Sequence, residues 1–293
     1  LDLAVGFAGQ LAIGYVALLT LGAYTATILV HRFEVSPFIG LIGAAAVGAV
    51  SGVIVGLPAL RLRTFYFAMA TLAFAEVTRI SFELFTFRID VGGTLVGPNG
   101  TDGFGDVRYL FENGITPLQY MLLVWGLLAL VLAAFFALDR TRFGRAVRQA
   151  GADPLLAELQ GLSVIRIRLL AAAVAGALAG LGGGLYVHLL TYIEPASFNI
   201  MLGVHSLAYG LIGGLGTAVG PVVGVLIDIG VLETSRLFAG YRMIVFGGLV
   251  ALLLIVRPRG ILDERAVHWI TLRIRRSTDA LGRTGLGSSL RRR

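Results

Sequence analysis

Ionisable side chains inside apolar stretches are the residues of this sequence whose types could do chemistry. They are Glu76, Arg79, Glu83, His188, Glu194, His205, Asp228 and Glu233. A charge within a membrane is costly, so such residues often mark an ion or substrate route. Asp228 lies alone in VLIDIGVL and is the best single candidate for a functional group. The other acidic and basic residues have simpler interpretations. Glu76–Arg79 and Arg79–Glu83 have the spacing of helical ion pairs, which we favour over a substrate site, and the two histidines suit hydrogen bonds within the fold.

The sequence contains no motif of an enzyme. It has no phosphate-binding GxxxxGK[ST] loop, no HExxH and no nucleophile elbow. The glycine-rich run 180–184 lacks the lysine and the preceding strand of a nucleotide cradle. The absence of cysteine excludes disulfides and thiolate metal sites. We therefore expect no catalytic residue, no metal ligand and no cofactor held by this chain.

Composition predicts an all-α, polytopic transmembrane helix bundle. Hydrophobic residues make up 57% of the 293 residues and charged residues only 14%, whereas soluble domains carry about 25% charged residues. The 40 glycines fit membrane helices better than soluble ones. The net charge of +7 comes from arginines, sixteen of which fall in 140–168 and 257–293, beside apolar spans. That placement indicates cytoplasmic loops and not nucleic-acid binding.

Eight apolar runs are candidates for membrane spans, because a crossing needs roughly 20 residues. They are about 3–30, 38–57, 64–87, 118–138, 166–191, 200–214, 216–235 and 242–256. Splitting 200–235 at Gly213-Gly214-Leu215-Gly216 gives an even number of crossings between the two arginine clusters, so that both lie inside. This topology places loop 139–168 in the cytoplasm and the turn-rich loop 88–117 outside. The loop 88–117 is a plain connection or a landing surface for a delivery partner. We expect a permease domain at 1–262 and a basic cytoplasmic tail at 263–293. The start at Leu1, without methionine or a charged leader, suggests that sequence precedes it.

Glycines recur with a spacing of four in three ladders, Gly48/Gly52/Gly56, Gly176/Gly180/Gly184 and Gly216/Gly220/Gly224. Residues four apart share one helix face, where glycine lets a neighbouring backbone approach closely. We favour a role in holding the fold together. Gly-interrupted segments in both halves also suggest broken helices along a pathway. The pathway and packing candidates are Gly9, Gln10, Gly14, Gly180, Gly184, Gly213, Gly214, Gly216, Gly220 and Asp228.

The segment Asp139–Arg168 predicts a helix–turn–helix. Asp153 is a suitable cap for a short helix with Pro154 at its first position, and Gly161 ends that helix. Leu155, Leu156 and Leu159 give the helix an apolar face. A helix of seven residues is not stable alone in water, so it must dock. It either lies on its own bundle, with arginines meeting lipid phosphates, or fits a groove on a motor protein.

Several runs resemble the permeases of ATP-binding-cassette importers for branched-chain amino acids and related substrates. They are VGFAGQLAIGYVALLTLGAYTATIL (5–29), GLPALRLRTFYFAMATLAFAEVTRI (56–80), GPNG (97–100), GRAVRQAGADPLLAELQGL (144–162), GALAGLGGGLYVHLLTYIEPASF (176–198), GLIGGLGTAVGPVVG (210–224) and RPRGIL (257–262). The match looks closer to the second, longer permease of the heterodimer. One departure is Ala150-Gly151-Ala152, where the family often carries charges.

The resemblance implies a multi-pass subunit of the bacterial inner membrane that imports branched-chain amino acids, or related amino acids and amides, by alternating access. It implies a second permease, two cytoplasmic ATPases that hold ATP and Mg, and an extracytoplasmic binding protein. The residues expected to couple to an ATPase are Arg145, Arg148, Asp153, Leu155, Leu156, Glu158, Leu159 and Gly161.

The main alternative is an ion-coupled secondary transporter, in which Asp228 or Glu76 carries the ion. Such a carrier has no need of the segment 142–161. A membrane-embedded enzyme would need a convergent set of catalytic residues, and only scattered ones are present. Broken helices and polar groups within the spans disfavour a non-transporting scaffold or receptor.

Overall fold

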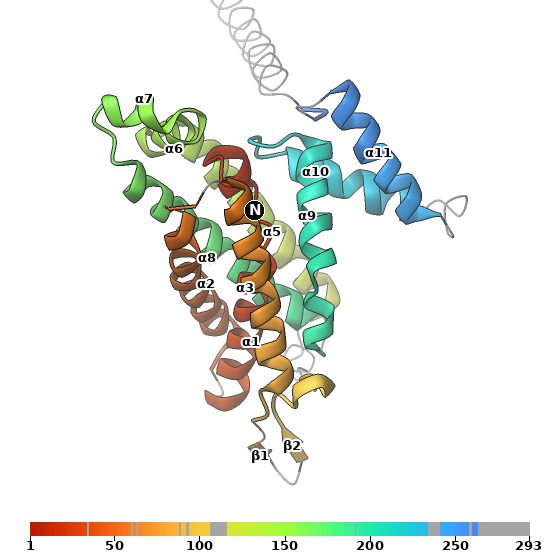
Figure 1. The fold of residues 1–293 in the computed structure, drawn as a ribbon. Coiled ribbons are helices and arrows are strands. Elements are labelled where there is room, and N and C mark those ends of the chain that lie inside the picture. Colours follow the sequence, from red (N-terminus) through yellow and green to blue (C-terminus); the bar gives the residue numbers. More distant parts are fainter. Residues whose placement is uncertain are drawn as a thin grey trace, which may run out of the picture. The chain divides into compact units, whose positions relative to one another are not determined.

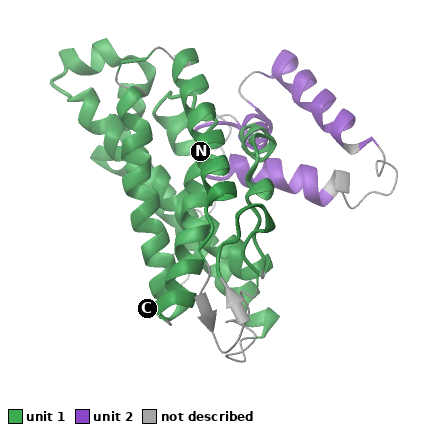
Figure 2. Cartoon of the chain, turned by 60° about the horizontal axis from the view of Figure 1, so that its bottom comes forward, with its two compact units in different colours: residues 1–207 green, residues 208–293 purple. Residues whose placement is uncertain are grey.

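The fold was analysed in a computed structural model that describes residues 1–33, 35–59, 61–62, 64–87, 89–91, 94–105, 116–190, 192–233, 241–257 and 260–262. The chain divides into two compact units, Leu1–Leu207 and Ala208–Arg293 (Figure 2). The predicted permease domain 1–262 extends over unit 1 and the described part of unit 2. The predicted basic tail 263–293 lies outside the described residues.

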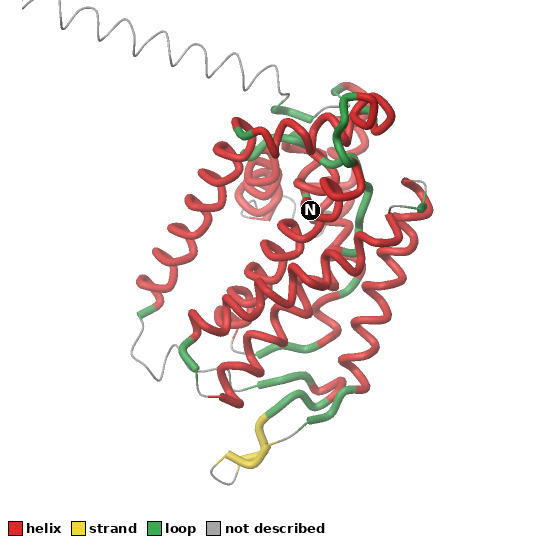
Figure 3. Tube along the Cα trace, turned by 90° about the vertical axis from the view of Figure 1, so that its left-hand side faces the viewer, coloured by secondary structure: helices red, strands yellow, loops and turns green. Residues whose placement is uncertain are grey.

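Unit 1 is a bundle of long helices, which confirms the predicted all-α fold (Figures 1 and 3). Its long helices are α1 (Tyr15–Phe33), α2 (Pro37–Ala59), α3 (Thr64–Leu84), α5 (Pro117–Arg140) and α8 (Val164–Leu190). Of these, α1, α2, α5 and α8 are long and apolar enough to cross a membrane. The predicted span 64–87 corresponds to α3, which has the length but carries three charged residues. The predicted span 3–30 is instead a short helix η1 (Leu3–Phe7), a break, and then α1.

Local signals explain where α5 begins. Thr116 caps its N-terminus by accepting a hydrogen bond from the Gln119 amide, and the Gln119 side chain accepts one from the Thr116 amide. Pro117 occupies the first helical position, where its missing N–H costs nothing. At about 1.5 Å per residue, the 24 residues of α5 extend about 36 Å. This length is enough to cross the hydrocarbon core of a bilayer, which is about 30 Å thick.

The first two glycine ladders interlock with each other, which the sequence alone did not predict. A Cβ on Gly48 or Gly176 would overlap the carbonyl oxygen of the other residue. The same holds for Gly180 against the carbonyl of Ala44, and for Gly22 of α1 against that of Gly180. The helices α1, α2 and α8 therefore pack backbone to backbone, the arrangement that small residues permit when lipid supplies no hydrophobic drive.

Short segments close the end of unit 1 opposite α6 and α7 (Figure 1). The predicted external loop contains an antiparallel hairpin of β1 (Ile89–Val91) and β2 (Thr94–Val96), followed by η2 (Gly100–Asp102). Backbone bonds between Phe104 and Ile193, 2.7 and 2.9 Å long, tie this loop to the segment before η3 (Pro195–Phe198). Residues 88, 92–93 and 106–115 of the predicted turn-rich loop lie outside the described residues.

Helix α9 (Ile200–Gly213) begins in unit 1 and ends in unit 2. Unit 2 also contains α10 (Gly220–Val225), which continues as the π-helix η4 (Leu226–Glu233), and α11 (Arg242–Val256). Ile212 and Phe246 form its core. The predicted break in 200–235 is confirmed, because no helix covers residues 214–219 of this described stretch. Two of its glycines adopt positive φ, 117° at Gly214 and 79° at Gly216.

The prediction that the third glycine ladder shares a single helix face is wrong. Gly216 lies in the turn before α10, where its left-handed backbone breaks the helical spacing to Gly220. Gly220 packs on Gly214 within the turn, and only Gly224 packs a helix against α9, at Tyr209. The Ile261 and Leu262 amides of the RPRGIL run donate to the Ile212 and Gly213 carbonyls over 2.9 Å each. These bonds satisfy carbonyls at the end of α9.

Candidate functional site

The predicted helix–turn–helix lies at one end of unit 1 as α6 (Arg142–Ala152) and α7 (Pro154–Leu159), as Figure 1 shows. Thr141 caps α6 through the Gly144 amide at 3.1 Å. Asp153 caps α7, as predicted, by accepting from the Leu156 amide at 3.0 Å, with Pro154 at the first position. Gly161 follows the helix with a φ of 80°, the left-handed conformation that glycine adopts without strain.

The apolar face of α7 is exposed. Leu155, Leu156 and Leu159 are 69%, 53% and 78% exposed, whereas Ala157 on the opposite side is only 1% exposed. Ala157 belongs to the main core of unit 1, and its carbonyl accepts from the Leu162 amide at 3.1 Å. The helix is therefore held by one small residue while its leucines point away from the unit. Glu158 and Gly161 are also exposed.

Helix α6 rests on the N-terminal segment of the chain, a contact that the sequence did not predict. Val147 and Ala150, both 1% exposed, pack in one core with Leu3 and Phe7 of η1. Gly151 meets the break that follows η1. A Cβ there would overlap the Phe7 carbonyl oxygen, and a Cβ on Gly9 would lie 2.8 Å from the Gly151 oxygen. The unusual Ala150-Gly151 pair therefore serves an internal contact.

The arginines of α6 differ in their surroundings. Arg148 points inward: its Nε lies 2.8 Å from Asp139 Oδ1 and its guanidinium sits 4.3 Å from the centre of the Phe7 ring. Arg145 is exposed and donates to the Arg140 carbonyl at 3.1 Å. Of the two arginines predicted to couple to an ATPase, Arg145 is available on the surface and Arg148 holds the loop to η1.

The break before α1 contains the other predicted pathway residues of the N-terminal half. Gln10 is only 7% exposed, and its side-chain nitrogen Nε2 has no hydrogen-bond partner among the described residues. The Gly14 amide donates to Thr71 Oγ1 of α3 at 3.3 Å. The break is thus fixed by α3 on one side and by α6 on the other.

The pathway candidates of the C-terminal half belong to unit 2. Gly213, Gly214, Gly216 and Gly220 form the turn described above, while Asp228 lies in η4 and is 2% exposed. The Tyr209 hydroxyl donates to Asp228 Oδ2 at 2.9 Å, and the Tyr209 ring packs edge-on against Phe246. Asp228 is thus a hydrogen-bonded carboxylate in the core of unit 2, within a π-helix, a conformation frequent at functional sites.

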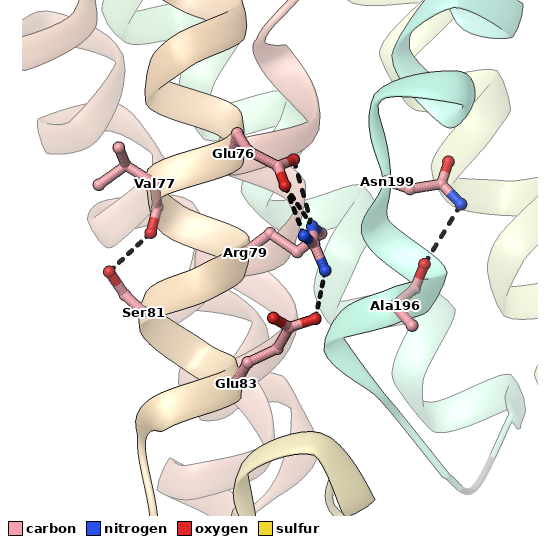
Figure 4. A network of polar contacts seen from close by, with 7 residues as sticks. All are labelled: Glu76, Val77, Arg79, Ser81, Glu83, Ala196 and Asn199. Atoms are coloured by element: carbon pink, nitrogen blue, oxygen red, sulfur yellow. Dashed lines mark hydrogen bonds and ion pairs between the residues drawn. The ribbon is translucent and has the colours of Figure 1, made fainter.

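The remaining ionisable residues have the partners that their spacing suggests. Arg79 pairs with both Glu76 and Glu83, which confirms the predicted ion pairs (Figure 4). His188 is buried and its Nδ1 lies 2.6 Å from the Gly184 carbonyl, and His205 makes the same contact with Met201 at 3.1 Å. These contacts fit hydrogen-bonded fold residues. The part of the chain that the structure describes holds no group of three acidic, histidine or cysteine residues suited to a metal ion.

Comparison with known proteins connects this architecture to a family. The family model described as "Branched-chain amino acid transport system / permease component" matches residues 1–256. The chain belongs to this family. It is 30% identical over 285 residues to the high-affinity branched-chain amino acid transport system permease protein LivM of Salmonella typhimurium, covering 89% of this chain and 66% of LivM. The permease chain thus spans just under two thirds of that relative.

Other relatives of the permease are named for ribose as well as for branched-chain amino acids. It is 30% identical over 265 residues to the ribose import permease protein RbsC of Escherichia coli, covering 84% of this chain and 76% of RbsC. It is 26% identical over 267 residues to the probable branched-chain amino acid transport permease protein LivH of Methanocaldococcus jannaschii, covering 86% of this chain and 82% of that LivH. No solved structure matches the chain. Family membership therefore identifies a multi-pass permease component and leaves its substrate to be proposed.

Proposed function

We propose that this chain is a transmembrane subunit of an ATP-driven importer of branched-chain amino acids in the bacterial inner membrane. Family membership and the similarity to LivM support the substrate class. The arginine-rich loops support an orientation with α6 and α7 in the cytoplasm. The chain itself supplies no catalytic group, and ATP with Mg binds to separate ATPase subunits.

The observation that carries this proposal is the exposed leucine face of α7 on a fixed base. A leucine side chain left in water forgoes about 1.5–3 kcal/mol of burial energy, and three of them lie together here. A groove on an ATPase would bury them. The contacts between α6 and η1 then give the ATPase a rigid element to move. The break around Gly9 is where the chain would bend during this movement.

The same reasoning assigns the other partners. A second permease completes the pathway, as LivM and LivH are both named permease proteins of such systems. An extracytoplasmic binding protein delivers substrate to the end of unit 1 formed by β1, β2, η2 and η3. ATP binding and hydrolysis shift the equilibrium between inward- and outward-open states through their differential affinity for the two.

The test is ATP-driven uptake of radiolabelled leucine by the complete complex in vesicles. Leu156→Asp, which places a charge in the docking face, should reduce uptake and ATPase co-purification at least tenfold, and Gly161→Asp should do the same. Leu156→Met keeps an apolar side chain and is the matched control. Membrane levels of the permease verify folding. Normal uptake by both Asp variants, or uptake by the wild type without any ATPase, would contradict the proposal and favour the ion-coupled carrier.

A further inference from the structure

Helix α3 has three distinct sides. An apolar, exposed side carries Val77 and Leu84, which are 61% and 78% exposed and suit lipid. A buried side carries Ala75 and Thr78, which pack within unit 1. The third side lies between the other two and carries a stripe of residues at helical spacing, which are Leu72, Glu76, Arg79 and Glu83. Every charged residue of α3 lies on this stripe.

The charges of the stripe do not cancel. Arg79 Nε donates to both Glu76 oxygens at 3.1 and 3.2 Å, and the same guanidinium pairs with Glu83. One guanidinium facing two carboxylates leaves a net charge of −1. The side chains of Arg79, Glu76 and Glu83 remain 22%, 35% and 25% exposed. Lipid hydrocarbon does not tolerate such a stripe, so it faces water or a cation.

The stripe lies near the end of unit 1 that is opposite α6 and α7. Glu83 is in the last turn of α3, and α3 contacts η3. Figure 4 shows Arg79 and Glu83 pointing toward the segment with Ala196 and Asn199, whereas Val77 and Ser81 point to the opposite side of α3. The charged groups are thus turned toward the segment with Ala196 and Asn199 and away from the side that carries Val77.

A second polar group lies close to this segment. The Tyr24 hydroxyl of α1 is buried, with the residue 1% exposed, and has no hydrogen-bond partner among the described residues. The Tyr24 ring stacks on Phe82, the neighbour of Glu83, with 4.0 Å between centroids. Helix α1, which carries Tyr24, also contacts η3. A buried hydroxyl without a partner beside excess negative charge suits a ligand that donates hydrogen bonds.

We propose that the stripe of Glu76, Arg79 and Glu83 lines the substrate route and binds the α-ammonium group of an amino acid entering from the outer side. The inference rests on the proposed function for its substrate class. The carboxylates attract the ammonium group, and Arg79 keeps them from repelling each other when the route is empty. The carboxylate in excess over Arg79 gains a cationic partner only while the ammonium group is present.

Thiol labelling tests whether the stripe is wet and negative, and it does not depend on ATP. The chain has no cysteine, so Leu72→Cys introduces a single thiol into the stripe of this chain and leaves all three charges in place. In the full complex, a membrane-impermeant cationic methanethiosulfonate applied from outside should modify it about tenfold faster than the anionic analogue. The ratio should fall toward one in a Glu76→Gln/Glu83→Gln background. Val77→Cys, on the lipid side of the same helix, is the matched control and should stay unmodified.

Substrate protection and transport complete the test. Leucine supplied with the binding protein should slow modification of the cysteine at position 72. Glu76→Gln/Glu83→Gln should lower leucine uptake at least tenfold, whereas Ser81→Ala should change neither uptake nor basal ATPase activity. An unreactive cysteine at position 72, equal rates with both reagents, or normal uptake by the double variant would overturn the inference. If the Leu72→Cys complex labels as expected but the wild-type complex takes up no leucine with ATP, the proposed function is contradicted instead.

Discussion

The Gly151 Cα faces the backbone of Phe7 so closely that a single added methyl group would overlap the Phe7 carbonyl oxygen. This relationship joins α6, in the loop proposed to meet an ATPase, to the segment that leads into the broken start of α1. Gly9 completes the contact from the other side with a φ of 64°.

Gly151→Ala should therefore loosen α6 from η1. The added Cβ has no space without a backbone shift, and overpacking of this kind costs about 1–3 kcal/mol. We expect a lower melting temperature and fewer leucine molecules transported per ATP hydrolysed. Ala152→Ser, at the exposed neighbouring position, is the control. Unchanged coupling in Gly151→Ala would show that the contact transmits no motion.

Gly176→Ala should destabilise unit 1, because the new methyl group would overlap the Gly48 carbonyl oxygen of α2. Gly182, six residues further along α8, has open space around it, so Gly182→Ala should be neutral or stabilising through its better helix propensity, by up to about 1 kcal/mol. Thermal unfolding in detergent compares the two. Equal melting temperatures would argue against tight packing of α2 on α8.

Tyr209→Phe should weaken unit 2. It removes the 2.9 Å bond to the buried Asp228 carboxylate, and a hydrogen bond to a charged group contributes about 1.5–3 kcal/mol. Tyr241→Phe, at a residue that is 68% exposed, should have no effect. Denaturant unfolding measures both variants. A Tyr209→Phe protein as stable as the wild type would show that Asp228 does not need this bond.

Gly103→Ala should separate the loop around η2 from the segment at Ile193. Gly103 has a φ of 74°, and a Cβ would overlap the Ile193 carbonyl oxygen. Gly105→Ala meets only the Tyr192 ring, at 3.4 Å, and should be tolerated. We expect faster proteolysis of the loop in Gly103→Ala alone. Similar cleavage of both variants would contradict the role assigned to Gly103.

Local signals predicted much of this fold. The cap at Asp153, the proline after it and the glycine at position 161 act within a few residues, so they located α7 to within one residue. Glycine pairs likewise located the break after Gly213. The ion pairs of Arg79 followed from helical spacing, because both partners lie on the same helix.

Contacts between distant segments were not predictable from one sequence. Nothing near Gly151 indicates that Phe7 lies against it, and nothing near Gly48 identifies Gly176 as its neighbour. The spacing of Gly216 and Gly220 suggested a helix face because periodicity does not report the sign of φ. The hydrogen bond between Asp228 and Tyr209 joins separate helices, so the sequence pointed to Asp228 as a candidate but not to its partner Tyr209.

The three leucines of α7 have a consequence for how the permease is made. Under the proposed function, a subunit synthesised without its ATPase would leave these three leucines exposed to water, and exposed apolar patches promote aggregation. If the proposed docking holds, the cellular lifetime of the permease should then follow the amount of ATPase present, because unpaired copies would be degraded.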